Sequence, residues 1–449
     1  MKILLIDPNL SGMISQNVGL AYVISSVEQR HRVKLLDLTF QSKRYNEYIL
    51  AQIEREKPDL VGLSVTSFSL RVSMEISELI KRRCSEIRII WGGGYPTLFP
   101  EESISSPSID AICIGEGEIS ALEYLNRLED GSEPNVEGIW YKDKKGLVHK
   151  NRLRPFEENI DNMPFPNWDH WKMDKHLEKN LYFVPGAVKF LASRGCPYSC
   201  SFCSNDAIRK SIPGRYYRQR TPQNIIEEIK INESRYWEKG FRVIHFADEI
   251  FGLNYEFLKD FCRLFKKEGL DKKFSWCCAT RADVITEDWA RTAADSGCVW
   301  IWLGIESGDD YVRNGVYKKN ITGDQIIGAV SCLRNNGIAY NFSIMVGCPE
   351  DTRETIEKSI RLAKALKPAT FDVSFYQPLP KTELGAEILR TMKVRDIVFD
   401  RHVDYPRIRT KSLSISDLNK IMWKIRLIKL YMFLFVGLKS KKIVFILDI

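Results

Sequence analysis

No uninterrupted apolar run of this 449-residue chain approaches the roughly 20 residues that a membrane-spanning helix needs, and Leu430–Leu438 is far shorter. The start, MKILLIDPNL, lacks the charged n-region and the cleavage site of a signal peptide, so we expect a first strand there. Eight of the eleven cysteines are scattered, mostly within apolar runs. This usage argues against a secreted disulfide framework and favours buried thiols in a reducing compartment, so we expect a cytoplasmic protein.

The chain also lacks the marks of several ligand-binding classes. No GxGxxG motif follows the first expected strand, which argues against dinucleotide binding. The net charge of +8 is mixed in sign along most of the chain, and no basic stripe with interleaved aromatics indicates nucleic acid as a substrate. The charge fits a solvated surface, an anionic substrate or a membrane surface.

The segment SRGCPYSCSFCSN carries the strongest chemical signal. It places Cys196, Cys200 and Cys203 in a CxxxCxxC cluster. Soft sulfur ligands select zinc, copper(I) or iron–sulfur centres. A structural zinc needs a fourth ligand, and no nearby CxxC or HxxxH supplies one. The pattern therefore favours an iron–sulfur cluster with one iron open to a ligand that is not protein; a zinc knuckle or reduced buried thiols is the alternative.

This spacing, with Phe202 just before the last cysteine, resembles the signature of the radical S-adenosylmethionine (SAM) family. The resemblance implies a 4Fe-4S cluster whose open iron binds SAM. It also implies an external electron donor, such as flavodoxin or ferredoxin, and reductive cleavage of SAM to methionine and a 5′-deoxyadenosyl radical. In such enzymes the cofactor carries the chemistry, and the protein binds, orients and excludes water.

The first 130 residues alternate short apolar runs with amphipathic stretches. This alternation predicts a parallel, doubly wound sheet whose ligands bind beyond the carboxyl ends of the strands. The expected strands are Lys2–Ile6, Arg32–Leu36, Asp59–Val65, Ile87–Trp91 and Asp110–Ile114. The expected helices are Val18–Gln29, Tyr45–Glu56, Leu70–Cys84 and Glu118–Leu128. Hydroxyls and consecutive glycines follow the strand ends, where backbone can approach a ligand closely.

The stretches GLAY, VGLSVTS, GGGYPTLFPEE and ICIGEGE, in this order, resemble the cobalamin-binding domain that precedes many radical SAM cores. The residues that the resemblance implies for cobalamin are Asn9, Gly12, Gly19, Ser64, Thr66, Gly92, Gly93, Gly94, Thr97 and Glu116. A DxHxxG stretch is absent, and the corresponding loop reads DPNLSG, so no histidine of that motif ligates cobalt. The alternative is a Rossmann-like domain that holds no cofactor.

A second series of strands and helices begins at residue 186. It predicts a partial (β/α)₆ barrel, which is the fold of the radical SAM core, with its active site at the carboxyl ends of the strands. The expected strands are Val188–Ser193, Arg242–Phe246, Phe274–Ala279, Trp300–Ile305, Asn341–Val346 and Phe371–Tyr376. The expected helices are Pro222–Lys239, Tyr255–Glu268, Glu287–Ser296, Gly323–Asn335 and Arg353–Leu366.

We therefore expect four parts: a cobalamin-binding domain (1–130), a connector (131–185) with a hairpin at Gly138–Val148, a radical SAM core (186–384) and a helical C-terminal region (385–449). In the last part SISDLNK supplies a capping serine before an amphipathic helix. That helix either covers the barrel or packs on another subunit, or it forms a basic amphipathic membrane anchor.

Polar residues end the core strands, and the radical SAM resemblance implies SAM contacts for them. The acidic pair Asp248–Glu249 would meet the SAM amino group, because charge-assisted hydrogen bonds are strong; an acidic helix N-terminus is the alternative. Arg281 would clamp a carboxylate of SAM or substrate. The other implied contacts are Glu306 with the ribose, Met345 and Gly347 with the adenine, and Phe202 with the adenine or the cluster. His245 and Cys348 are expected to be packing residues.

The two resemblances together imply a cobalamin-dependent radical SAM enzyme. The expected reaction is methylation of an unactivated carbon in a small-molecule or lipid-like substrate. One alternative uses the same cofactors for cyclisation, rearrangement or another redox step. The other is a non-catalytic iron–sulfur or corrinoid protein.

Overall fold

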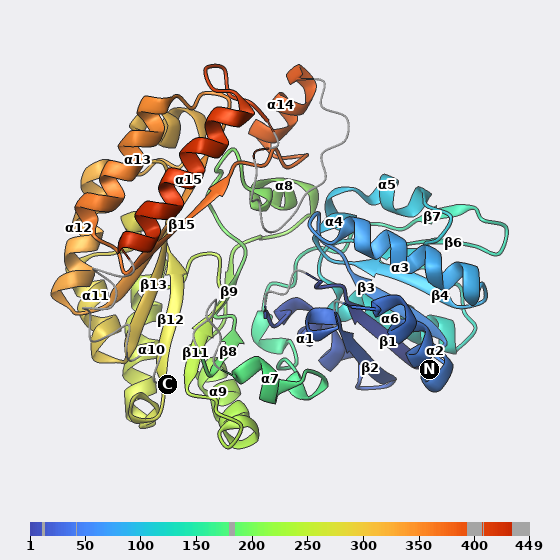
Figure 1. The fold of residues 1–449 in the computed structure, drawn as a ribbon. Coiled ribbons are helices and arrows are strands. Elements are labelled where there is room, and N and C mark those ends of the chain that lie inside the picture. The colour runs from blue at the N-terminus through green and yellow to red at the C-terminus, as the bar shows by residue number, and fades with distance from the viewer. Residues whose placement is uncertain (11–13, 42, 179–184, 393–405, 407, 433–449) are drawn as a thin grey trace. The chain divides into compact units, whose positions relative to one another are not determined.

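The computed structural model describes the whole chain except residues 11–13, 42, 179–184, 393–405, 407 and 433–449 (Figure 1). The chain divides into two compact units. The described residues of the first unit lie within Met1–His176 and Ala207–Arg218, and those of the second lie within Leu177–Asp206, Gln219–Ile397 and His402–Ile449.

The first unit is built on a seven-stranded sheet with the order β2-β1-β3-β4-β5-β6-β7. Strands β1 to β5 pair in parallel and β6 and β7 are antiparallel. The strands are β1 (Lys2–Asp7), β2 (Arg32–Asp37), β3 (Leu60–Ser64), β4 (Arg88–Gly92), β5 (Ala111–Cys113), β6 (Ile139–Lys142) and β7 (Val148–Lys150). The order reverses between β1 and β3, which makes their carboxyl ends the switch point where such sheets bind ligands.

The helices of this unit are α1 (Val18–Val27), α2 (Tyr45–Glu56), α3 (Leu70–Arg83), α4 (Gly94–Leu98), α5 (Pro100–Ser105), α6 (Gly117–Glu129) and α7 (Met173–Leu177). Helix α1 contacts α6, and α2 contacts α3. Strand β1 is buried along nearly its whole length, as expected of a parallel strand with both faces covered. The fold class predicted from the alternating pattern is confirmed, and the hairpin expected in the connector extends the sheet as β6 and β7.

The second unit contains six parallel strands that follow chain order across the sheet, as a partial (β/α)₆ barrel requires. They are β8 (Ala187–Phe190), β11 (Val243–Phe246), β12 (Ser275–Thr280), β13 (Cys298–Glu306), β14 (Ala339–Val346) and β15 (Thr370–Phe375). The helices between them are α9 (Pro222–Tyr236), α10 (Tyr255–Lys267), α11 (Glu287–Asp295), α12 (Gly323–Asn335) and α13 (Arg353–Leu366), and Figure 1 shows α10 to α13 outside the strands. The short elements β9 (Ser193–Arg194), α8 (Ser204–Ser211) and β10 (Arg218–Gln219) lie between β8 and α9.

Two helices follow the barrel strands, α14 (Glu383–Met392) and α15 (Ile415–Met432). The serine predicted to cap α15 does so, because the Asp417 backbone N–H donates to Ser414 Oγ at 3.2 Å. The buried face of α15 consists of Leu418, Ile421, Met422 and Ile425. In the part of the chain that the structure describes, no helix is both long enough and apolar enough to cross a bilayer.

Candidate cofactor-binding sites

One asparagine links two strand ends at the switch point of the first sheet. The Asn17 side-chain amide donates to Asp7 Oδ1 at 3.4 Å and to Ser64 Oγ at 3.2 Å. Its Oδ1 accepts from the Leu20 backbone N–H at 3.1 Å and caps α1. Asn17 was missed by the sequence analysis, although an asparagine directly before an apolar-periodic helix is a recognised cap signal. It joins the carboxyl ends of β1 and β3, where Ser64 was predicted to contact cobalamin.

The glycine run after β4 has two different roles. Gly93 has φ +99°, and a Cβ there would lie 2.8 Å from the Val65 carbonyl oxygen, so only glycine fits. A Cβ at Gly94 would meet nothing within 4 Å. The Thr97 hydroxyl donates to the Gly93 carbonyl at 2.8 Å and accepts from the Gly115 N–H at 3.0 Å. Gly93 and Thr97 therefore shape the loops, and Gly94 leaves room for a ligand.

The other residues predicted for cobalamin are spread over the same unit. Asn9 donates to Thr39 Oγ1 at 3.0 Å, toward β2. The Thr66 N–H donates to Ser69 Oγ at 3.0 Å in an exposed turn. Gly92 ends β4 and Gly19 lies in α1, and Gly12 lies outside the described residues.

Glu116 is engaged by a buried arginine of its own unit. Arg218 donates to both of its carboxylate oxygens, at 2.8 and 2.9 Å, and its guanidinium lies 4.8 Å from the Phe156 ring centroid. The Glu157 N–H donates to the same carboxylate at 3.2 Å. Local sequence could not reveal this pair, because its members are 102 residues apart. Glu116 thus anchors the loop after β5, and a direct contact with cobalamin stays a prediction.

The cysteine loop follows β9, and all three of its thiols are partly exposed, whereas Cys113, Cys262, Cys277, Cys278, Cys298 and Cys348 are buried. Two contacts fix the loop: the Ser201 N–H donates to the Tyr317 carbonyl at 3.1 Å, and its hydroxyl donates to the Val316 carbonyl at 2.6 Å. Burial raises the pKa of Cys196 and raises that of Cys203 to about 11.

Among the described residues, no three His, Cys, Asp or Glu side chains already stand as a metal-ligand set. The thiols lie near one another, because Cys200 contributes to the raised pKa of Cys196, and Cys200 and Cys196 contribute to that of Cys203. Three soft, partly exposed thiols on one loop fit an iron–sulfur cluster, and their deprotonation accompanies metal binding.

The acidic pair after β11 divides into two roles. Asp248 is buried, and it accepts from the Ala192 N–H at 3.0 Å and from the Ser193 hydroxyl at 2.6 Å. Burial raises its pKa to about 6. Glu249 is exposed to solvent, yet partial desolvation by nearby protein atoms raises its pKa. It bonds Asn205, whose amide lies 3.5 Å from Cys203 Sγ. Asp248 holds the chain that leads into the cysteine loop, and Glu249 lies beside the thiols.

Arg281 lies against the cysteine loop, and its guanidinium group donates hydrogen bonds to two other residues. It donates to both oxygens of Asp283 at 2.9 and 3.0 Å and to the Lys319 carbonyl at 2.8 Å. The guanidinium carbon is 3.6 Å from the Tyr198 ring centroid, and Nη1 is 4.0 Å from Cys200 Sγ. Neither Tyr198 nor Asp283 was predicted as a site residue, although Tyr198 lies within the quoted cysteine motif. Contact of Arg281 with a SAM carboxylate stays a prediction.

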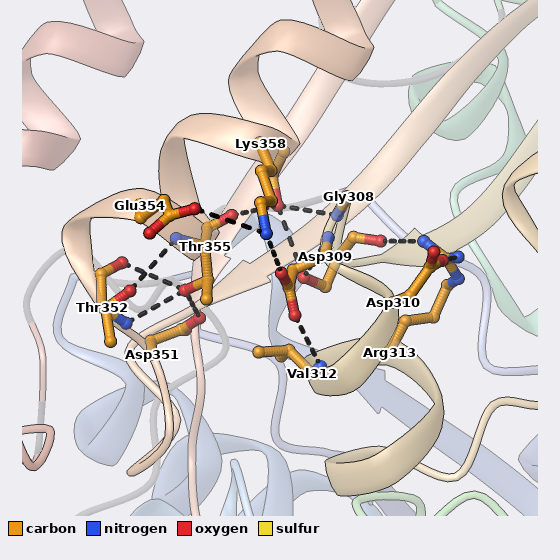
Figure 2. Close-up of polar contacts among 12 residues, drawn as sticks. Gly308, Asp309, Asp310, Val312, Arg313, Asp351, Thr352, Glu354, Thr355 and Lys358 are labelled. Atoms are coloured by element: carbon orange, nitrogen blue, oxygen red, sulfur yellow. Dashed lines mark hydrogen bonds and ion pairs between the residues drawn. The ribbon is translucent and has the colours of Figure 1, made fainter.

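Glu306 ends β13 in a left-handed conformation, with φ +67°, and its Oε1 accepts from Lys319 Nζ at 2.8 Å. The loop after it is fastened to α13, as Figure 2 shows. Lys358 Nζ lies 2.9 Å from Asp309 Oδ2, and the Gly308 N–H donates to Ser359 Oγ at 2.7 Å. This bracing fixes where the Glu306 carboxylate stands.

Two of the three residues predicted to contact adenine pack against one apolar cluster. Phe202 and Met345 pack against a core that includes Tyr317, Cys348 and Tyr376. Phe202 meets the Tyr317 ring edge-on, with centroids 5.3 Å apart. Gly347 has φ +88°, and its N–H donates to Asp351 Oδ2 at 2.7 Å.

Two packing predictions agree with the structure. Cys348 is fully buried, and burial raises its pKa. His245 stacks on Trp302, with ring centroids 5.1 Å apart, and burial lowers its pKa to about 3. Both residues are therefore neutral packing groups.

Comparison with known proteins adds independent findings. Residues 190–363 match the radical SAM superfamily, and residues 10–125 match the B12 binding domain. The chain is 32% identical over 438 residues to an uncharacterized methyltransferase of Pyrococcus horikoshii, covering 94% of this chain and 91% of that protein. It is 26% identical to the anaerobic magnesium-protoporphyrin IX monomethyl ester cyclase of Rubrivivax gelatinosus, over 88% of this chain and 71% of that one.

Among solved structures, the radical SAM methyltransferase TsrM from Kitasatospora setae, with cobalamin and a [4Fe-4S] cluster bound, superposes with a TM-score of 0.69. The match covers 87% of this chain and 74% of that one at 19% identity, so it shows likeness of fold.

Proposed function

Because this chain belongs to the radical SAM enzyme family that carries a B12-binding domain, we propose that it methylates an unactivated carbon of a small-molecule or lipid-like substrate. The observation that carries the proposal is the presence of both domains in one chain that resembles an uncharacterized methyltransferase over 94% of its length. The cofactors of the family are a 4Fe-4S cluster, SAM and cobalamin, and an external donor such as flavodoxin or ferredoxin would supply electrons in the cytoplasm.

In this proposal residues 186–384 hold the cluster and SAM. When bound, these cofactors supply a radical that can take hydrogen from carbon. Cys196, Cys200 and Cys203 ligate the cluster. Glu249, exposed beside the thiols, accepts from the SAM ammonium group, which suits a carboxylate. The Glu306 carboxylate accepts from ribose hydroxyls.

Asp248 and Arg281 act as positioning residues. Asp248 holds the Ala192 and Ser193 backbone segment that leads into the cysteine loop. Arg281 holds the loop itself through the Tyr198 ring and also places positive charge near Cys200. A positive charge near the cluster favours its reduced form, since hydrogen bonding and local charge set such potentials.

Residues 1–130 hold cobalamin at the switch point of the first sheet. When bound there, cobalamin supplies the methyl group. Ser64 and Thr66 offer hydroxyls to the nucleotide tail, and Gly94 offers unobstructed backbone. Gly93, Thr97 and Glu116 fix the loops around it.

Cyclisation or rearrangement with the same cofactors is the second candidate, and the resemblance to a cyclase over most of the chain favours it. Both candidates predict SAM cleavage, but only methyl transfer from SAM consumes SAM to S-adenosylhomocysteine.

The test uses anaerobically reconstituted enzyme with reductant, cobalamin and methyl-labelled SAM. We expect 5′-deoxyadenosine, S-adenosylhomocysteine and label on the bound cobalamin. Cys200→Ala should reduce 5′-deoxyadenosine to background and lower the iron content, whereas Cys332→Ala, at a cysteine of helix α12, should change neither. 5′-Deoxyadenosine without S-adenosylhomocysteine would favour the second candidate. Absence of both products in iron-replete enzyme would contradict the proposed chemistry.

A further inference from the structure

Helix α15 presents an exposed apolar pair to solvent. Trp423 and Leu427 are 64% and 63% exposed, among the most exposed large apolar side chains of the described residues. They are four residues apart, so they lie on one face of the helix. The opposite face is buried through Leu418, Ile421 and Ile425. The helix is thus apolar on two sides, and only one of them is covered within the described chain.

Basic side chains flank the exposed pair. Lys420, Lys424 and Arg426 are exposed, and at 100° per residue they fall on either side of the line through Trp423 and Leu427. The Arg426 guanidinium lies 5.8 Å from the Trp423 ring centroid. The one acidic residue of α15, Asp417, accepts from the Ser414 hydroxyl at the start of the helix, away from this pair.

The sequence beyond continues this charge pattern. Between residues 418 and 447 the chain has seven lysines and arginines and no aspartate or glutamate. Elsewhere the charges are mixed, since the whole chain has 66 basic and 58 acidic residues. One segment therefore concentrates cationic and apolar character without counter-charge in its sequence.

We propose that the Trp423–Leu427 face of α15 docks on the surface of an anionic lipid bilayer. Tryptophan prefers the interface between headgroups and acyl chains. Leucine adds apolar area, and long basic side chains keep their charge among the headgroups while their stems cover apolar surface. A basic amphipathic helix of this kind lies on a membrane and does not span it, in agreement with the absence of a spanning helix among the described residues.

A second copy of this chain is a poorer occupant of the same face. Two such faces would bring Lys420, Lys424 and Arg426 of each copy together, and like charges in contact repel. An anionic bilayer has the opposite sign and attracts such segments by roughly 1 kcal/mol per Lys or Arg, about fivefold in binding for each.

The proposal is tested by co-sedimentation of the reconstituted full-length protein with vesicles. We expect at least about tenfold tighter binding to phosphatidylcholine vesicles containing phosphatidylserine than to phosphatidylcholine alone, with a loss in high salt. The double variant Trp423→Ser/Leu427→Ser should bind about tenfold or more weakly, because it removes the apolar anchors. Lys420→Gln/Lys424→Gln should lose most of the preference for the anionic lipid.

The matched control is Leu147→Ser/Ile327→Ser, which also removes two exposed apolar side chains. It should bind vesicles as the unaltered protein does, and circular dichroism and iron content should show that every variant is folded. Failure of the unaltered protein to bind anionic vesicles would overturn the proposal. So would full binding by Trp423→Ser/Leu427→Ser, which would assign binding to another segment. Loss of self-association in that variant, without vesicle binding by the unaltered protein, would identify a second copy as the occupant.

Discussion

Around the switch point of the first sheet, the strand-end loops are joined mainly by amide, hydroxyl and backbone groups, and the buried Arg218–Glu116 pair anchors only the loop after β5. In the second unit, charged side chains hold the cysteine loop. In the first unit Asn17 and Thr97 make the connections, and glycine brings backbones together. In the second, Asp248 and Arg281 hold the cysteine loop. Neutral hydrogen bonds tolerate loss of one partner better than buried ion pairs do. The two edges should therefore respond differently to the same kind of substitution.

The largest effect is expected from Arg281→Met. It leaves Asp283 without its partner in a mostly buried pair, which costs about 3–5 kcal/mol. Urea unfolding of the second unit, with iron per chain measured in parallel, should show both a lower midpoint and less iron. Arg281→Lys keeps the charge but not the bidentate geometry. Its urea midpoint and iron content should lie between those of the unaltered protein and Arg281→Met.

The matched control is Arg263→Met, because Arg263 pairs with Asp260 on the surface. It should cost less than about 1 kcal/mol. Equal effects of Arg281→Met and Arg263→Met would show that the Arg281–Asp283 pair does not gain stability from its burial.

A buried carboxyl in each unit should also make folding stability depend on pH, and the two dependences should have opposite signs. The pKa of Asp248 is raised to about 6, so its folded state holds a proton longer than the unfolded state, and its contribution is lost as pH rises from about 4 to 6. Burial alone would raise the pKa of Asp37, but hydrogen bonds from His176 and Thr39 hold it below its ordinary value. Its contribution is present above about pH 4 and is lost as pH falls through the lowered pKa.

Stability curves against pH for Asp248→Asn and Asp37→Asn should therefore deviate from the unaltered protein in different windows. Between about pH 4 and 6, Asp248→Asn should reduce the fall of the unfolding free energy with pH by up to the slope that one bound proton contributes. Asp37→Asn should lower stability at neutral pH and converge with the unaltered protein in acid. The same deviation in both variants would contradict the assigned environments.

The smallest effect on stability is expected in the glycine run after β4, where Gly93 and Gly94 can be compared. Gly93→Ala should cost about 1–3 kcal/mol, because a Cβ would press on the Val65 carbonyl at a φ that alanine disfavours. Gly94→Ala should leave stability nearly unchanged, since nothing lies within 4 Å. Retention of cobalamin after gel filtration tests the proposed contact of the Gly94 backbone with the cofactor. Gly94→Ala should weaken this retention, because the added methyl group would occupy the space left for the ligand. Loss of stability in Gly94→Ala would show that both glycines are structural.

The sequence predicted the elements well where local signals mark them. Helices α12 and α13 begin after Thr322 and Thr352, which cap them, and both were predicted with their observed bounds. The roles of Asp248 and Glu249 could not be separated, because adjacent acids look alike until the fold places the Ala192 N–H and the Ser193 hydroxyl against one of them. Arg218 and Glu116 likewise meet only through the fold. Local pattern reveals elements, and tertiary contacts assign partners.

The left-handed conformation of Glu306 has a consequence for ligand binding. Asparagine or glycine would adopt this φ more readily than glutamate, so the backbone is strained at this position. That carboxylate grips the ammonium of Lys319, and the Lys319 carbonyl receives the Arg281 guanidinium that rests on the cysteine loop. A change in the position of the Glu306 carboxylate would therefore also disturb Lys319 and, through its carbonyl, the contact of Arg281 with the cysteine loop.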